Sequence, residues 1–208
     1  MKMKKFFLSL VVALLSVPAF AQYGSGGFSL SESSLYYGIR LGMNVSSITG
    51  DYVDLDSKTG VALGAVVGVR VSEATPLFIE GGLYYSGRGA KKDKTTASLN
   101  YLEVPILIKY GVQVADNIAL LPYIGPYFSL GVGGKYKYQV AGGNIEKDGI
   151  YDHFNRGDMG FKVGCGAEYN MLYLELGYQF GVANIAKDNP TDLAAHTGNF
   201  FVNLGVNF

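Results

Sequence analysis

Long hydrophobic runs are scarce in this chain of 208 residues, although 49% of its residues are apolar. The one long apolar stretch, Phe6 to Val17, lies near the N-terminus and is too short to cross a bilayer as a helix. The other apolar residues fall in many short segments that are rich in glycine and aromatic residues. This distribution is typical of a β-barrel or a β-sandwich.

Cysteine is nearly absent as well. The single Cys165 excludes an internal disulfide, and its place in an alternating stretch indicates an inert buried or lipid-facing thiol rather than a nucleophile. The sequence has no zinc motif, phosphate-binding glycine loop or nucleotide fingerprint, and its glycines recur at the period of a strand, which indicates barrel packing. We therefore expect no cofactor.

The N-terminus has the pattern of a secretory signal peptide. Three lysines precede the apolar run, and the small-x-small motif Ala19-Phe20-Ala21 predicts cleavage between Ala21 and Gln22. We expect a signal peptide at 1–21, a flexible periplasmic lead-in at 22–35 and a barrel domain at 36–208. Loss of the three lysines leaves 14 basic against 17 acidic residues, a net charge of −3, which argues against a nucleic-acid partner.

The last stretch, Phe200 to Phe208, shows the pattern that recurs along the chain. Every second residue is apolar, and the residues between them are mostly small and polar. The same alternation predicts eight strands, each long enough to cross a membrane when tilted. They are expected at 37–46, 60–71, 77–86, 101–110, 120–131, 160–169, 172–181 and 200–208. The predicted fold class is all-β, an eight-stranded antiparallel up-and-down transmembrane β-barrel.

The connections between these strands alternate in length. Long ones are expected at 49–59, 87–98, 139–157 and 182–197, and short ones at 72–76, at 113–117 and at Asn170. Outer-membrane barrels have long outer loops and short periplasmic turns. Because the strand count is even, we expect an integral protein of the Gram-negative outer membrane with both termini in the periplasm.

One face of the predicted strands is rich in glycine and carries most of the charges, so we place it inside the narrow barrel. The expected lumen charge network has four basic and four acidic members: Arg40, Arg70, Lys109, Lys162, Glu80, Glu103, Glu168 and Glu175. Unpaired buried charges are costly, so these should form a salt-bridged plug. The alternative is a path for protons or ions.

The other face is broad and apolar, with aromatic residues near the strand ends. It predicts two interfacial girdles. They consist of Tyr37, Tyr110, Tyr169 and Phe208 on the periplasmic side, and of Tyr85, Phe128, Phe161, Tyr178, Phe180 and Phe200 on the outer side.

Three prolines interrupt the predicted fourth and fifth strands: Pro105, Pro122 and Pro126. A closed barrel has no edge strand in which to place a proline. We expect a β-bulge between these strands, or else a weak seam through which lipid or a partner enters.

The stretch Tyr101-Leu102-Glu103-Val104-Pro105, followed by aliphatic residues and Lys109-Tyr110, resembles the PorT-like outer-membrane β-barrel family. Two further stretches are similar to that family: 122–127, and 164–169 with 173–178. The likeness spans roughly 36–208 and implies an outer-membrane barrel in which the three prolines are family features. The member that names the family is associated with a protein secretion machine, but no motif here carries that role.

Some loop residues are candidates for binding or catalysis. A basic second loop is expected to contact phosphates of outer-leaflet lipid through Arg88, Lys91, Lys92 and Lys94. Its alternatives are a solvated loop or pairing with an acidic first loop that contains Asp51, Asp54 and Asp56. That acidic loop lacks calcium-loop spacing, so we expect no metal.

A lipid-modifying enzyme would need a nucleophile, a histidine and an acid together. Its candidates are Ser86, His153, His196, Asp152, Asp158 and Asp192.

These observations favour a small, monomeric, non-enzymatic outer-membrane barrel. It would act as a membrane scaffold, or as an accessory subunit that presents loops to an envelope protein partner. The alternatives are a narrow conduit or lateral path for small molecules and, less favoured, a lipid-modifying enzyme.

Overall fold

The computed structural model describes residues 35–50, 56–72, 74–92, 94–140, 143–152, 155–185 and 195–208. The predicted signal peptide, its cleavage site at Ala21 and Gln22, and nearly all of the lead-in lie outside the described residues. Within the described ranges, no helix is long and apolar enough to cross a membrane.

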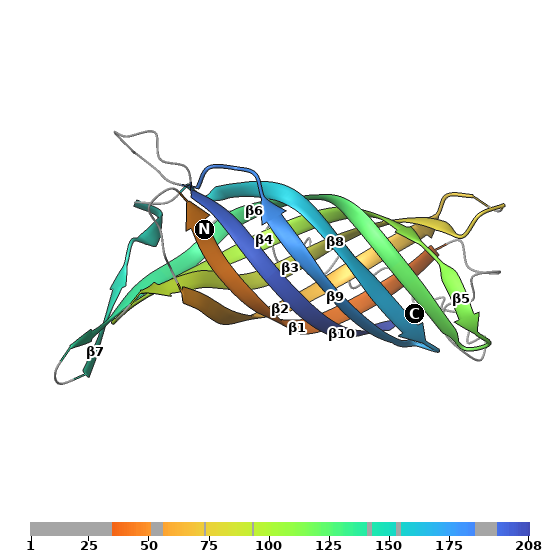
Figure 1. The fold of residues 1–208 in the computed structure, drawn as a ribbon, viewed down its shortest axis with the longest axis horizontal. Coiled ribbons are helices and arrows are strands. Elements are labelled where there is room, and N and C mark those ends of the chain that lie inside the picture. Colours follow the sequence, from red (N-terminus) through yellow and green to blue (C-terminus); the bar gives the residue numbers. More distant parts are fainter. Residues whose placement is uncertain are drawn as a thin grey trace, which may run out of the picture.

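Eight long antiparallel strands in the described part of the chain close into a barrel (Figure 1). They are β1 (Leu35–Gly50), β2 (Asp56–Arg70), β3 (Leu77–Lys92), β4 (Thr95–Tyr110), β6 (Ile118–Val140), β8 (Gly157–Tyr169), β9 (Leu172–Gly181) and β10 (Ala195–Asn207). Each strand pairs with the next long strand along the chain, and β1 pairs with β10 to complete the ring. The predicted fold class is confirmed.

The two ends of the barrel differ. The short-turn end holds the Asn170 turn, the short β5 (Val112–Ala115) and the C-terminus, where Tyr37 and Phe208 exchange backbone hydrogen bonds of 3.1 and 2.7 Å. The long-loop end holds β7 (Gly143–Asp148) and the 3-10 turn η1 (Ile150–Asp152). Figure 1 shows the hairpin of β6 and β7 projecting from this end, beyond the other strands.

One of the expected long loops is mostly strand and another contains a strand hairpin, so the predicted loop bounds were wrong. β3 continues to Lys92 and β4 begins at Thr95, which leaves only a short turn within 87–98. β6 continues to Val140 and forms a hairpin with β7 inside 139–157. Here the outward face of the sheet also carries polar residues, whereas the inward face stays buried at Arg88 and Ala90. The alternation of apolar and polar residues that marks a strand is therefore lost.

Side-chain burial on the strands is reversed relative to a soluble protein. On β1, Ile39, Leu41 and Met43 are 56%, 62% and 58% exposed, whereas Arg40 and Asn44 between them are 0% and 2% exposed. Neighbouring residues of a strand point to opposite faces, so the apolar set covers the outside and the polar set fills the interior. All ten aromatic residues expected in the two girdles point outward and are exposed.

Large aromatic side chains fit into the narrow interior because glycines lie opposite them. Tyr84 on β3 pairs with Gly64 on β2, and Tyr36 on β1 pairs with Gly68. A Cβ atom added to either glycine would overlap the ring of its partner tyrosine. The lumen-facing glycines therefore serve packing, because they free the space that the tyrosine rings occupy.

The prolines do not cause the bulge that the sequence predicts. The register shift between β4 and β6 lies at Asn100 and Tyr101, whereas the register is unchanged on either side of Pro105. Pairing is interrupted only between Pro105↔Tyr127 and Ile108↔Ile124. The two backbones remain in contact there, because a Cβ atom on Gly125 would overlap the carbonyl of Ile106.

The change Gly64→Ala should destabilise the barrel by about 1–3 kcal/mol, since the added methyl group displaces the buried ring of Tyr84. The matched control is Gly81→Ala, because a Cβ atom at Gly81 meets nothing within 4 Å. Urea unfolding in detergent micelles, followed by circular dichroism, measures the difference. Equal losses for the two variants would contradict the packing account.

Candidate functional site

The barrel interior is the most highly charged part of the described structure. Nine charged residues are buried there, four basic and five acidic: Arg40, Arg88, Lys109, Lys162, Glu80, Glu103, Asp158, Glu168 and Glu175. They come from β1, β3, β4, β8 and β9 and meet in the lumen because each occupies an inward position of its strand. Two carboxylates, Glu80 and Glu103, organise them into two clusters.

The Glu80 cluster lies toward the short-turn end. Lys109 places its ammonium 2.7 Å from Glu80, and the Tyr36 hydroxyl donates to the same carboxylate at 2.7 Å. Arg40 approaches Glu80 at 3.8 Å and donates to Asn207 at 2.6 Å. The Arg40 guanidinium also lies 3.9 Å from the centre of the Tyr173 ring, so its flat face is covered as well.

The Glu103 cluster lies toward the long-loop end. Glu103 accepts hydrogen bonds from Arg88, from Lys162 at 2.9 Å and from the Gln179 amide at 2.9 Å. Arg88 also reaches Asp158 at 3.0 Å. The two cations of this cluster therefore balance its two carboxylates, and the hydroxyls of Tyr127 and Thr197 also lie within hydrogen-bond distance of Asp158, at 3.3 and 3.0 Å.

Two further carboxylates are held by neutral groups. Glu175 accepts from Asn203 at 2.6 Å and from the Tyr173 hydroxyl at 3.3 Å. Glu168 accepts from Asn207 at 2.7 Å. The lumen is thus a connected polar network in which hydrogen bonds supplement the ion pairs, as buried charges require.

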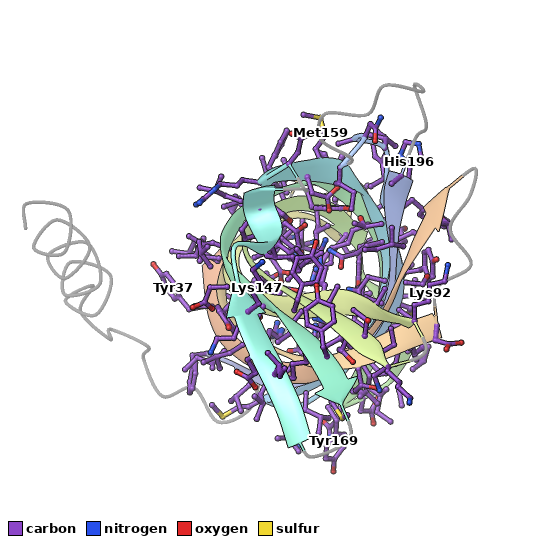
Figure 2. The ribbon with its side chains drawn as sticks, turned by 90° about the vertical axis from the view of Figure 1, so that its left-hand side faces the viewer. Tyr37, Lys92, Lys147, Met159, Tyr169 and His196 are labelled. Atoms are coloured by element: carbon purple, nitrogen blue, oxygen red, sulfur yellow. The ribbon has the colours of Figure 1, made fainter. Side chains whose placement is uncertain are left out.

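An apolar cluster, which we call the cap, covers this network at the long-loop end. Ile150 and Tyr151 of η1 fold over the mouth and pack against Leu99, Tyr101 and further residues of the cap: Ile48, Ala90, Ile185 and Ala195. Figure 2 views the barrel from this end and shows side chains crowded across its interior. The polar lumen is therefore closed over by an apolar layer.

Two residues lie elsewhere than predicted, one from the lumen charge network and one from the lipid-contacting loop. Arg70, expected in the lumen, lies half-buried at the last position of β2, and its Nε donates to the carbonyl of Ser72 at 2.8 Å. Arg88, expected to contact lipid, is 1% exposed inside the Glu103 cluster, so that prediction was wrong. The other seven residues of the predicted network are buried in the lumen.

Sequence reasoning missed Arg88 and Asp158 because the strands were ended too early. Arg88 continues the inward series of Tyr84 and Ser86 on β3, and Asp158 precedes the inward Gly160 and Lys162 on β8. Extending the same two-residue period past the expected strand ends would have placed both in the lumen.

The remaining basic candidates, Lys91, Lys92 and Lys94, are exposed at the long-loop end. Of the acidic first loop, Asp51 and Asp54 lie outside the described residues, whereas Asp56 begins β2 opposite Lys91. In the described part of the chain, no group of three or more His, Cys, Asp or Glu residues could hold a metal ion.

Among the described residues, those considered for a lipid-modifying enzyme do not come together as a catalytic triad. Ser86 and Asp158 each contact Arg88 inside the barrel. His196 instead lies 3.2 Å from the carbonyl of Ala183. His153, Asp192 and the side chain of Asp152 lie outside the described part of the structure.

Comparison with known proteins identifies the family. The family model described as "Outer membrane protein beta-barrel domain" matches residues 20–187. The chain belongs to this family. It is therefore an integral outer-membrane protein. A comparison with curated proteins gave no match.

Several solved outer-membrane proteins are similar in structure. The chain is 15% identical to Ail, the attachment invasion locus protein of Yersinia pestis, with 85% of this chain and 100% of that chain covered and a TM-score of 0.47. The chain is 18% identical to neisserial surface protein A, with 85% of this chain and 98% of that chain covered and a TM-score of 0.46. It is 11% identical to a major outer membrane protein from Thermus thermophilus, with 85% of this chain and 100% of that chain covered and a TM-score of 0.49.

Replacing Glu103 with Gln should destabilise the barrel by about 3–5 kcal/mol, because Arg88 and Lys162 would lose the carboxylate that they share in the buried lumen. Urea unfolding in micelles measures this, with tyrosine fluorescence as the signal because the chain has no tryptophan. The matched control is Glu146→Gln, which removes an exposed carboxylate that two lysines also share. A Glu103→Gln variant as stable as this control would disprove the role of the network.

Proposed function

We propose that this protein is a non-enzymatic, monomeric barrel of the outer membrane that acts as a scaffold or as an accessory subunit of an envelope complex. The termini face the periplasm, because the start of β1 and the end of β10 share the end with the short turns. The long-loop end then faces outward. The finer likeness to PorT-like proteins agrees with this proposal and remains a prediction.

The filled lumen argues against the conduit alternative. The nine buried charges are linked by ion pairs and hydrogen bonds, and the cap covers them. A steady aqueous path would require these contacts to break. The lateral route is also disfavoured, because β4 and β6 remain in contact across the prolines.

The observation that carries the accessory role is the hairpin of β6 and β7. It extends beyond the barrel at the long-loop end (Figure 1), yet it exposes the apolar residues Tyr138 and Ile145, which pair across the hairpin and are 38% and 55% exposed. Among the described residues, β7 pairs with β6 alone, so its other edge is open. Such an edge is a template for the addition of a strand from a partner.

A lipid-facing role for Lys91, Lys92 and Lys94 is compatible with this proposal. All three are exposed at the long-loop end, where outer-leaflet phosphates would lie. Arg88 is no longer part of this set.

If the hairpin docks a protein partner, a photo-cross-linking amino acid at Ile145 should give one adduct of defined mass in intact outer membranes. The matched control is the same amino acid at Leu63, which is 56% exposed on the lipid-facing side of β2. In addition, Ile145→Asp should abolish stoichiometric recovery of that partner with the tagged protein in mild detergent. Identical products from both positions, or recovery that Ile145→Asp leaves unchanged, would contradict the accessory role.

A further inference from the structure

A groove of about 500 Å³ lies at the long-loop end, where β6 leaves the barrel. This volume is within the range of small-ligand sites. Its walls come from β4, from β6 and from the segment that returns through η1. Its basic lining residues are Lys135, Lys137 and Arg156, and its acidic lining residue among those described is Asp148.

The bulge in β6 explains why this groove is basic. Phe128, Leu130 and Val132 all point outward and are 50%, 56% and 51% exposed. The register between β4 and β6 then shifts by one residue at Gly131 and Gly133, so the alternation of faces is reversed. Beyond the shift, Tyr136 packs against the cap, and its neighbours Lys135 and Lys137 are therefore on the outward face.

The groove begins at the level where lipid head groups lie. Leu130 pairs with Leu102, and Leu102 pairs with Tyr85 of the outer aromatic girdle. Val132, which lines the groove, is the next outward residue of β6 after Leu130. Along the outward face of β6, the side chains thus change from apolar at Val132 to basic at Lys135 and Lys137, just beyond the girdle.

Arg156 is fixed beside the two lysines. Its carbonyl accepts a hydrogen bond of 2.7 Å from the backbone of Gly131, and its guanidinium lies 5.2 Å from the centre of the Tyr151 ring. The Tyr151 hydroxyl donates to the carbonyls of Asn100 at 3.0 Å and Gly133 at 3.3 Å, which ties η1 to the wall of the groove. These contacts hold Arg156 and η1 against the strands that form the wall of the groove.

The positive charge of the groove is only partly neutralised. Lys135 and Lys137 share the single carboxylate of Glu146, at 3.2 and 2.6 Å. Both pairs are half-exposed, and such pairs exchange readily with another anion. Lys91 lies in the same row of the sheet as Lys137, with Thr96 between them, and adds a further positive charge nearby.

We propose that this groove binds the phosphorylated head group of an outer-leaflet lipid, whose acyl chains lie along Phe128, Leu130 and Val132. Lys135, Lys137 and Arg156 bind the phosphate through charge-assisted hydrogen bonds. The site rests on the outward orientation proposed above for the long-loop end. It does not require a protein partner on the hairpin.

Native mass spectrometry of the full chain in detergent micelles tests the site, with diphosphorylated lipid A as the probe. The triple variant Lys135→Gln, Lys137→Gln, Arg156→Gln should bind this lipid at least about tenfold more weakly than the unchanged protein. The matched control compares two single variants, Lys137→Gln and Lys147→Gln, each of which removes one positive charge from the hairpin. Lys137→Gln should weaken binding, because Lys137 lines the groove. Lys147 pairs with Tyr136 and is on the opposite face of the sheet, so Lys147→Gln should bind normally. Equal weakening by Lys137→Gln and Lys147→Gln would mean non-specific charge attraction and would overturn the site.

Two further measurements test the site. The first uses a variant expected to bind more tightly, which misfolding would not produce, and the second distinguishes a lipid head group from free phosphate. Glu146→Gln should tighten lipid A binding, since Lys135 and Lys137 lose the competing carboxylate. Unchanged or weaker binding would count against the site. Inorganic phosphate should compete poorly with lipid A because it lacks acyl chains, and full displacement would indicate a free-phosphate site instead. In micelles both ends of the barrel are accessible to lipid A. A failure to bind would therefore count against the groove itself and would not depend on which end faces outward in the membrane.

Discussion

The structure depends on the absence of water from the hydrocarbon core of a membrane. Every backbone N–H and C=O group there needs a partner within the protein, and a closed barrel supplies one for each strand. Pairing of β1 with β10 closes the ring. With eight strands the interior is too narrow to stay empty, so side chains fill it. Glycines make room for the tyrosines, and the charged residues that enter must find partners, as Arg88 and Lys162 do at Glu103.

The same constraint determines what the sequence can predict. Inside the bilayer the two faces of a strand meet different surroundings, so the two-residue period is strict, and the eight strands and seven of the nine lumen charges follow from it. Above the bilayer the outward face meets water as well, so its apolar residues give way to polar ones although the inward face stays buried. That is why β3 and β6 extend further than predicted, and why Arg88 was assigned to a loop. The bulge at Gly131 and Gly133 has no signal in the alternation and is visible only in the register.

The protein thus has two regions with different physical roles. The membrane region is a filled barrel whose contacts stabilise its own shape. The region beyond the girdle is an extension of the same sheet, and it exposes apolar residues on the hairpin and basic residues beside the groove. Cys165, which is half-buried on β8, contributes to neither role in the described structure. The two surfaces proposed for recognition therefore lie on the sheet outside the lumen.

The central claim is that the lumen is closed to water, and thiol labelling tests it most directly. Ser129 is buried on the inner face of β6 and is 6% exposed, so Ser129→Cys in a Cys165→Ala background places one nearly isosteric thiol inside the barrel. A water-soluble, charged thiol reagent should leave this cysteine unmodified in the folded protein and modify it after unfolding. The same reagent should rapidly modify Ser57→Cys, which is exposed at the long-loop end. Rapid modification of the Ser129→Cys thiol in the folded barrel would contradict the closed lumen and restore the conduit alternative.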